Sequence, residues 1–425
     1  MRNNSVGIVG LGYVGLPLAV EFCRAQFQVI GVDIDDERLA FLRQGRSYIA
    51  DVASQDIQEF VNSDCLCPSA DFSPLREVEG ISICVPTPLR KTREPDVSYV
   101  IAAAENISRI LHTGQLVILE STVYPGATES LVTPILEKSG LKAGRDFYLA
   151  FSPERIDPGN HSVQFKEIPK LVGGINEEST HRAVEFYQRV FDKVIPMTSA
   201  KEAEMAKLLE NTFRAVNIGL VNELAMMAHY MGINIWEVIE AAATKPFGFM
   251  PFYPGPGWGG HCIPIDPVYL SWRAKLDGLD TEFIDYAIKI NNHMPQYVVD
   301  RVANLLNEQG KPLHGSRLLI LGISYKRDVA DIRESPALPI LTSLVQKHAL
   351  VTYYDPYVPY LEYDGLVLKS QHLDKKLFSD QDCVIIITDH SCLDYKFIVE
   401  HSSLILDTRN ATRSLQQYST HIHLL

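Results

Sequence analysis

Short apolar runs separated by amphipathic stretches fill the first 195 or so residues of the chain. Residues 5–10 (SVGIVG) form one run, the following stretch LPLAVEFCRAQF has helical apolar spacing, and residues 28–35 (QVIGVDID) form a second run. A strand, a glycine turn, a helix and a strand in this order are the βαβ unit of a parallel sheet. Further strand candidates are residues 80–87, 115–122, 147–154 and 170–175. The pattern predicts a doubly wound α/β domain over residues 1–198.

A change of pattern begins at Ser199. Residues 199–232 contain no proline and a single interior glycine, Gly219, and they predict one long helix. This helix is apolar on more than one face, which is typical of a helix buried between two domains or two subunits. Residues 233–244, 266–278 and 282–310 also have helical patterns, and a loop rich in proline, glycine and aromatic residues covers 245–267. We therefore expect a central helical dimerisation and catalytic-loop region over residues 199–312.

The last part of the chain, residues 313–425, returns to alternating strands and helices. Strands are predicted at 316–325, 350–356, 382–390 and 403–410, with a helix at 335–349. The rhythm is that of the first domain, but a polar loop follows Gly322 where the first domain has further glycines. The fold class is therefore α/β, with two Rossmann-like doubly wound domains joined by a long central helix and a helical dimerisation region. Such a pair suggests a cofactor on one domain, a second ligand on the other, and chemistry between them.

Composition narrows the class of partner. The 425 residues carry 39 basic and 52 acidic side chains, a net charge of −13 with no basic run, which argues against a nucleic-acid partner. No signal peptide and no apolar stretch of membrane-spanning length are present, so no membrane partner is expected. The seven cysteines are scattered without zinc-site spacing. We expect a cytoplasmic enzyme with reduced thiols and no metal, in which any anionic ligand meets locally concentrated positive charge.

The first apolar run leads into the motif GLGYVG, which places glycines at positions 10, 12 and 15. This spacing between a strand and a helix is typical of a turn that brings a pyrophosphate to the helix N-terminus. Asp33 ends the next strand, where a carboxylate accepts hydrogen bonds from ribose hydroxyls and repels a 2′-phosphate, which favours NAD over NADP. Arg38 could face the adenosine, although alone it reads as a solvated charge. A purely structural glycine turn is the alternative interpretation.

Three residues in the central region suggest chemistry without establishing it. Cys262 closes the glycine-rich segment GPGWGGHC, with Asp266 four positions later. A lone cysteine is more often inert packing, but glycines let the backbone approach a ligand closely, so the two interpretations are balanced. Lys207 and Asn211 lie one helical turn apart and share a face. They could converge on an oxyanion, or Lys207 could be a surface lysine with a buried stem.

Seven motifs then occur in one order along the chain: GLGYVG (10–15), VPTP (85–88), ESTVYPG (120–126), SPERIDPG (152–159), AKLLENT (206–212), GGHCIPIDP (259–267) and SYKRDVADIRESP (324–336). In this order they resemble the UDP-glucose/GDP-mannose dehydrogenase family over essentially the whole chain. The segment 245–270 is most similar to the branch that acts on UDP-N-acetylhexosamines, especially the UDP-N-acetylglucosamine 6-dehydrogenases.

The resemblance implies a four-electron oxidation that uses two NAD. Cys262 would capture the intermediate aldehyde as a thiohemiacetal, a second hydride loss would give a thioester, and water would release a uronate. Lys207 and Asn211 would stabilise the oxyanions. Asp266, with a water held by Thr122, would accept the alcohol proton, and Glu154 would serve thioester hydrolysis.

The resemblance also implies binding residues. The cofactor set is Gly10, Gly12, Tyr13, Val14, Gly15, Asp33, Arg38, Thr87, Thr122 and Arg333. The substrate set is Glu154, Arg155, Lys207, Asn211, Phe252, Tyr253, Gly255, Gly259, Tyr325, Lys326 and Arg409. Three positions depart from relatives and bear on the identity of the sugar: Ile156, Pro158 and Trp258.

Two other functions are compatible with parts of the chain. A two-electron β-hydroxyacid dehydrogenase shares the glycine motif and the Lys-x-x-x-Asn helix, but it needs neither the cysteine nor the second α/β domain. A non-catalytic NAD-binding protein would not need the full reactive set. Among substrates UDP-N-acetylglucosamine leads, followed by UDP-N-acetylgalactosamine and UDP-glucose. The resemblance also implies a role in polysaccharide biosynthesis, and the apolar helix predicts a homodimer or a larger homo-oligomer.

Overall fold

A computed structural model of the chain defines residues 4–49, 51–156, 164–260, 262–415 and 420–425. The chain forms two compact units, one of residues 1–210 with 268–279, the other of residues 211–267 with 280–425. The three boundaries, at 210/211, 267/268 and 279/280, fall within or just after the helices α7 (Ala200–Tyr230) and α9 (Asp266–Leu276), which contribute residues to both units. The predicted three-part division into 1–198, 199–312 and 313–425 stays a prediction.

The first unit contains an eight-stranded sheet with the order β3-β2-β1-β4-β5-β6-β7-β8. Its strands are β1 (Ser5–Val9), β2 (Gln28–Val32), β3 (Leu66–Ser69), β4 (Gly80–Ile83), β5 (Leu116–Leu119), β6 (Tyr148–Phe151), β7 (Lys170–Gly174) and β8 (Val194–Pro196). Neighbouring strands are parallel except β6 and β7. The order of the first six is that of a dinucleotide-binding fold, which reverses direction between β1 and β4. The doubly wound domain predicted from the sequence is confirmed.

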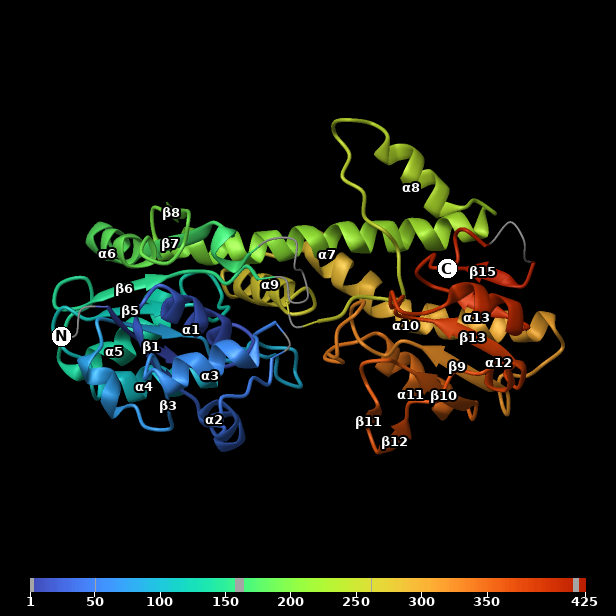
Figure 1. Ribbon diagram of the computed structural model, residues 1–425. Helices are drawn as coiled ribbons and strands as arrows, with labels where there is room; N and C mark the ends of the chain where they lie inside the picture. The colour runs from blue at the N-terminus through green and yellow to red at the C-terminus, as the bar shows by residue number, and fades with distance from the viewer. Residues whose placement is uncertain (1–3, 50, 157–163, 261, 416–419) are drawn as a thin grey trace. The chain divides into compact units, whose positions relative to one another are not determined.

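Both faces of this sheet are covered by helices (Figure 1). The helices are α1 (Gly15–Arg24), α2 (Asp36–Arg43), α3 (Ser54–Asn62), α4 (Ser98–Ser108), α5 (Thr133–Leu136) and α6 (Glu177–Tyr187). In β5, Leu116 and Ile118 pack into the core shared with α1 and α6, whereas Val117 and Leu119 pack into the core shared with α4 and α5. A strand buried on both faces is apolar throughout, which is why the sequence shows continuous runs here.

The second unit contains a parallel sheet with the order β10-β9-β13-β14-β15. Its strands are β9 (Arg317–Leu321), β10 (Leu350–Tyr354), β13 (Cys383–Ile386), β14 (Ile405–Asp407) and β15 (Ile422–Leu424), beside the hairpin β11 (Tyr360–Tyr363) and β12 (Leu366–Lys369). The helices α10 (Glu282–Glu308) and α11 (Ala337–Gln346) pack on one face, α12 (Lys375–Ser379) and α13 (Tyr395–His401) on the other. This order also reverses once, between β9 and β13, so the second Rossmann-like domain is confirmed.

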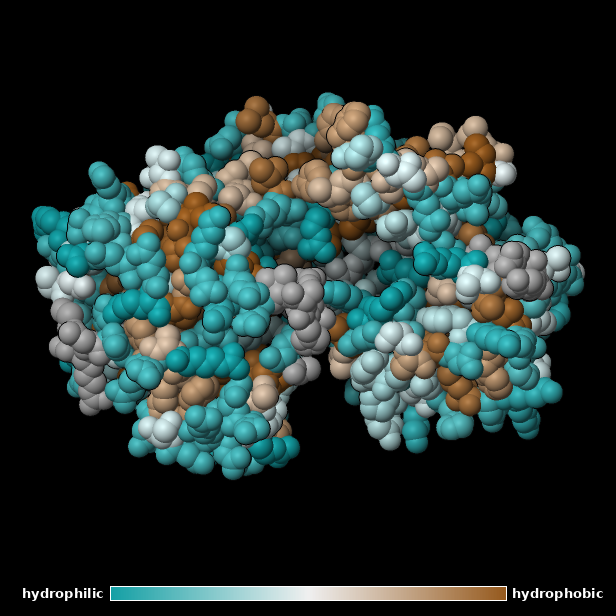
Figure 2. Space-filling model, turned by 45° about the horizontal axis from the view of Figure 1, so that its top comes forward, coloured by the Kyte–Doolittle hydropathy of each residue, from teal (hydrophilic) through white to brown (hydrophobic). Residues whose placement is uncertain are grey.

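The long helix predicted from Ser199 is present as α7, with 31 residues, and α8 (Ile235–Ala243) follows it. Gly219 has a packing reason: a Cβ there would lie 3.1 Å from the Ala287 Cα of α10. Large apolar side chains of the second unit are exposed on or near these helices, as the surface in Figure 2 shows around α7 and α8. They include Phe213, Leu220, Met227, Tyr230, Val238, Phe247, Phe249, Met250, Phe283 and Tyr286. Within the described ranges, no helix has both the length and the apolar content to cross a bilayer.

Candidate functional site

The glycine turn between β1 and α1 is crowded at two glycines and open at the third. A Cβ on Gly10, whose φ is +91°, would lie 2.6 Å from the Cys84 carbonyl oxygen, and one on Gly15 would lie 1.8 Å from the Gly10 carbonyl oxygen. A Cβ on Gly12 would meet nothing within 4 Å. The fold itself therefore requires Gly10 and Gly15, whereas Gly12 leaves space for a ligand to approach the backbone.

Asp33 directly follows β2 and faces this turn. It is only 6% exposed, and its Oδ2 accepts a hydrogen bond from the Leu11 N–H at 2.8 Å while its Oδ1 accepts one from the Asp35 N–H at 3.0 Å. A carboxylate has about four lone-pair sites, so it can still accept from a hydroxyl. Arg38 is not a lone solvated charge, because its Nη1 lies 3.6 Å from Asp33 and its Nε 3.3 Å from Asp35. The residue set fits the adenosine ribose of NAD.

Thr87, Thr122 and Glu154 follow β4, β5 and β6, so the parallel strands bring them to one edge of the sheet. The Thr87 carbonyl accepts from the Tyr269 hydroxyl at 3.0 Å. At the turn itself Tyr13 is exposed and Val14 half-buried, as is Thr122. The first unit thus collects most of the predicted cofactor residues around the carboxyl edge of β1 to β6.

Glu204 of α7 fastens the segment that follows Thr122, a role that the sequence did not reveal. Its carboxylate accepts from the Gly126 N–H at 2.5 Å and from the Thr128 N–H and hydroxyl at 2.8 and 2.6 Å. Burial raises the pKa of Glu204 to about 7, although these hydrogen bonds favour the carboxylate. An acidic residue near the start of a helix gives no signal of its three-dimensional partners, so only the fold could identify this contact.

Glu154 and Lys207 meet in the first unit. The Lys207 ammonium donates to the Glu154 carbonyl oxygen at 2.7 Å, and Lys207 is 6% exposed, so its interpretation as a surface lysine is wrong. The Glu154 Oε1 accepts from the N–H groups of Arg155 and Ile156, both at 2.6 Å. Arg155 pairs at 2.6 Å with Glu210, so its charge is already partnered. Pro158, one of the three departures, lies outside the described residues.

In the second unit, Cys262, Asp266 and Asn211 come together. The Cys262 carbonyl accepts from the N–H groups of Ile265 and Asp266 at 3.1 and 2.9 Å, a turn that leads into α9. Asp266 is 1% exposed, and the Asn211 amide donates to its Oδ2 at 2.6 Å. Cys262 is half-buried. Cys262 thus lies one turn before a buried carboxylate that an amide contacts, and these three residue types are suited to covalent chemistry at a carbonyl.

The glycine-rich loop before Cys262 lies against the second sheet. A Cβ on Gly255 would lie 2.5 Å from the Arg409 guanidinium, and one on Gly259 would lie 2.8 Å from the Tyr325 Cβ. Burial lowers the pKa of Arg409 to about 10. The structure thus brings together two pairs of predicted substrate residues that are distant in sequence.

The aromatic side chains of this loop contact the neighbouring helices α7, α8 and α10. Phe252 packs against Phe213 with ring centroids 5.8 Å apart, and Tyr253 stacks on Trp236 at 5.8 Å. Trp258, one of the three departures, is 8% exposed and donates to the Asn292 side chain at 3.1 Å.

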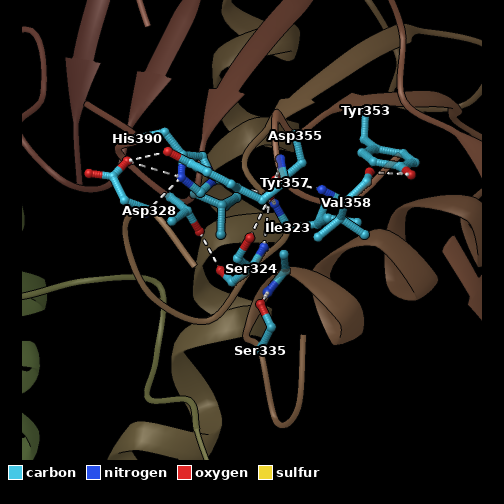
Figure 3. A network of polar contacts seen from close by, with 12 residues as sticks. Ile323, Ser324, Asp328, Ser335, Tyr353, Asp355, Tyr357, Val358 and His390 are labelled. Atoms are coloured by element: carbon cyan, nitrogen blue, oxygen red, sulfur yellow. Dashed lines mark hydrogen bonds and ion pairs between the residues drawn. The ribbon is translucent and has the colours of Figure 1, made fainter. Parts of the chain in front are cut away.

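A buried polar network holds the loop that carries Tyr325 and Lys326 (Figure 3). Asp355 follows β10 and accepts from the N–H groups of Ile323 and Ser324 at 2.8 and 3.0 Å. His390, which has no exposed surface, lies 3.1 Å from Asp355 through Nε2, and its Nδ1 accepts from the Asp328 N–H at 3.0 Å. One nitrogen donates and the other accepts, which describes a neutral imidazole.

Two charged residues of this loop, Arg333 and Lys326, were predicted to bind different ligands, the cofactor and the substrate. Arg333, predicted at the cofactor, has its guanidinium 2.5 Å from Asp331 of the same loop, and Lys326 is half-buried. The described candidate residues thus lie in both units, and each unit contains residues predicted to bind the cofactor and residues predicted to bind the substrate: Arg333 is the cofactor candidate that lies in the second unit. Among the described residues, no group of three His, Cys, Asp or Glu side chains could hold a metal ion.

Comparison with known families covers nearly the whole chain. Three models of the UDP-glucose/GDP-mannose dehydrogenase family match, the NAD binding domain at residues 4–191, the central domain at 201–293 and the UDP binding domain at 319–414.

Individual relatives match at similar levels of identity. A UDP-N-acetyl-D-glucosamine 6-dehydrogenase of Pseudomonas aeruginosa is 34% identical over 420 residues, 94% of this chain and 98% of the relative. A UDP-N-acetyl-D-mannosamine dehydrogenase of Methanococcus aeolicus is 36% identical over 392 residues, 91% of this chain and 85% of the relative. The solved structure of the UDP-D-ManNAc dehydrogenase from Pyrococcus horikoshii superposes with a TM-score of 0.89 at 32% identity, covering 99% of this chain and 98% of that one.

Proposed function

The chain belongs to the UDP-glucose/GDP-mannose dehydrogenase family and is an NAD-dependent nucleotide-sugar dehydrogenase, and from this premise we propose that it oxidises the C6 hydroxymethyl group of a UDP-N-acetylhexosamine to the uronate. The observation that carries the proposal is the cluster of Cys262, Asp266 and Asn211 in the second unit. A two-electron dehydrogenase needs no thiol there. The match of the UDP binding domain also argues against the two-electron alternative.

In the proposed reaction, the glycine turn and Asp33 would hold NAD, which when bound would supply the hydride acceptor for each of two oxidations at C6. Asp266, with a water held by Thr122, takes the hydroxyl proton in the first. The Cys262 thiolate then adds to the aldehyde carbon, and Asn211 and Lys207 stabilise the resulting oxyanion. Loss of the second hydride leaves a thioester. Water attacks its carbonyl carbon, the C–S bond breaks, the thiolate leaves, and Glu154 takes the proton of the attacking water.

A stoichiometric assay tests this proposal. We expect two NADH for each uronate formed by the wild-type enzyme. Cys262→Ser should leave NAD binding unchanged but stop uronate formation, since an alcohol is a poorer nucleophile and leaving group than a thiolate. Uronate production at the wild-type rate by this variant would contradict the covalent route, and one NADH per product would support the two-electron alternative.

UDP-N-acetylglucosamine is the proposed substrate, supported by the relative from Pseudomonas aeruginosa. UDP-N-acetylmannosamine, its C2 epimer, is a second candidate, because relatives named for it match this chain equally well. The residues alone did not suggest this epimer, since one inverted substituent changes only a few contacts, each of roughly 1–3 kcal/mol. Comparing kcat/KM for both, with UDP-N-acetylgalactosamine and UDP-glucose, decides between them.

We also propose that the enzyme is a homodimer, joined through the exposed apolar side chains of α7 and α8. Phe213, Leu220 and Met227 are each about half exposed and are spaced by seven residues, so they share one side of α7. Light scattering should give twice the chain mass of 47.6 kDa, and Leu220→Glu should reduce it to the single-chain value. A wild-type monomer would contradict the proposal. The cytoplasmic location expected from the sequence stays a prediction.

A further inference from the structure

A buried group of charged and polar side chains lies next to the carboxylate of Glu154 in the first unit. The Lys170 ammonium is 2.5 Å from the Glu120 Oε2 and 3.6 Å from the Glu154 Oε2. The Tyr187 hydroxyl donates to the other oxygen of Glu120. Lys170, Glu120 and Tyr187 are 4%, 1% and 0% exposed, so this group is shielded from water.

The two oxygens of Glu154 have different surroundings. Oε1 accepts both neighbouring backbone N–H groups, whereas Oε2 is buried and has no hydrogen-bond partner among the described residues. Lys170 is its nearest ion-pair partner. A buried carboxylate oxygen without a hydrogen-bond donor lowers the stability of the fold, so its presence calls for an explanation such as a catalytic role. Because no hydrogen-bond donor in the described part of the chain occupies its lone pairs, Oε2 keeps the capacity to accept a proton.

Packing alone does not account for this group. A buried ion pair contributes little to stability compared with apolar side chains of the same volume, because both charges lose their hydration. Aromatic neighbours surround Lys170, whose ammonium lies 5.3 Å from the ring centroids of both Tyr187 and Phe191, so an apolar residue would suit the site. Two acidic residues and one lysine at the carboxyl ends of β5 and β6 and the start of β7 indicate a role in chemistry.

We propose that Lys170 is a positioning residue for Glu154, and that Glu120 and Tyr187 hold Lys170 in place. This rests on the proposed role of Glu154 in thioester hydrolysis. The Lys170 ammonium fixes the direction of Oε2 and stabilises its negative charge before the attack. As water adds to the thioester carbon, its O–H proton moves to Oε2, and the C–S electrons leave with the Cys262 sulfur.

The charges around Lys170 agree with this role. Burial alone would lower the pKa of Lys170, but the charges of Glu120 and Glu154 outweigh burial and raise it, so the amine stays protonated. Burial raises the pKa of Glu120 in spite of Lys170, and burial raises that of Tyr187 and of the nearby Cys84 thiol, so the last two stay neutral. Without the ammonium, Glu120 and Glu154 would repel one another, and ionising both would require a higher pH.

The test measures the two hydride steps and hydrolysis separately in the variant Lys170→Met. The substrate is UDP-N-acetylglucosamine or, if the comparison of kcat/KM favours it, the C2 epimer of this sugar. We expect a burst of two NADH per active site at nearly the wild-type rate, followed by turnover slowed roughly 10- to 100-fold, less than the 10²–10⁴ attributed to a general base itself. Intact-protein mass spectrometry should find the acyl adduct on Cys262 accumulating. The acid limb of the hydrolysis rate should move to higher pH. Lys193→Met, at an exposed lysine on the neighbouring chain segment, is the matched control and should behave as the wild type.

Tyr187→Phe keeps the aromatic packing and removes only the hydroxyl, so it tests the same role if Lys170→Met does not fold. It should give the same burst and adduct with a smaller slowing. Equal slowing of all steps without an adduct, in either folded variant, would overturn the proposal. If the wild-type enzyme forms no uronate at all, the proposed function fails and the role of Lys170 with it.

Discussion

The two glycines Gly12 and Gly15 offer a test that separates binding of NAD from folding of the turn. The perturbation is the same single methyl group at each position. On Gly12 this methyl meets nothing within 4 Å, and the φ of Gly12 lies outside the left-handed range. On Gly15 it would lie 1.8 Å from the Gly10 carbonyl oxygen, at a distance where the backbone must move.

The expected magnitudes follow from these distances. Gly12→Ala should leave stability unchanged or raise it by about 0.4–1 kcal/mol, because alanine restricts the unfolded chain. It should weaken NAD binding about 10- to 100-fold, since the methyl occupies the space where the pyrophosphate approaches and lengthens one charge-assisted hydrogen bond of roughly 1.5–3 kcal/mol. Gly15→Ala must displace the Gly10 carbonyl by about 1 Å and should cost about 3 kcal/mol or more in unfolding free energy.

Two measurements on each variant are sufficient: chemical denaturation for stability and calorimetric titration with NAD for affinity. The reasoning would be refuted if Gly12→Ala bound NAD as tightly as the wild type, because the pyrophosphate would then not approach this turn. A Gly15→Ala variant with wild-type stability would refute the argument from crowding.

Single buried side chains also control stability and ligand binding in ways that can be measured. Since the pKa of Glu204 rises from 4.5 to about 7, the stability that its protonated form provides is complete below pH 4.5 and is lost as the pH rises to 7. Denaturation measured across this range should show that Glu204→Gln loses less unfolding free energy than the wild type, by up to about 3 kcal/mol. Asp33→Ala should weaken NAD binding about tenfold, and a wild-type preference for NADP in kinetic assays would contradict its assignment. His390→Phe removes two buried hydrogen bonds of about 1–3 kcal/mol each, so calorimetry should find UDP binding weakened and NAD binding unchanged; equal weakening of both would exclude a local role for the network.

The central strands and the long helix could be predicted because burial leaves a direct pattern in the sequence. β1, β4 and β5 are covered on both faces, so nearly every residue in them is apolar. The strands that escaped prediction are β3, β8 and β15, which lie at the edges of their sheets, and β11 and β12, which form the separate hairpin; all five are only partly buried. β3 even contains Pro68, which an edge strand tolerates. Their pairing depends on the neighbour that they meet, and that neighbour is distant in the sequence.

The residues of the candidate site divide in the same way into those that the sequence identifies and those that only the fold identifies. The glycine motif was identifiable because its spacing alone suggests a chemistry, whereas the local sequence left Cys262 balanced between packing and chemistry and only the family resemblance gave it a role. Glu204, Lys170 and His390 could not be identified, because each is a single polar residue whose partners lie 16 to 78 positions away. Only the folded arrangement of strands, helices and loops brings these partners together. The residues that hold a site are therefore harder to predict than those that react in it.

Asp33 and Asp355 occupy the same place in the two sheets, yet only one of them can bind a ribose. Each follows the second strand of its βαβ unit and accepts from the N–H after a glycine of positive φ, Gly10 or Gly322. Asp33 accepts two backbone hydrogen bonds. Asp355 receives from Ile323, from the N–H and hydroxyl of Ser324, from His390, and from the N–H groups of Tyr357 and Val358. These donors already exceed the four or so lone-pair sites of a carboxylate, so a sugar hydroxyl finds no acceptor there. A nucleotide on the second domain must therefore be recognised by other groups, and the same fold position that binds a ligand in one domain holds a loop in place in the other.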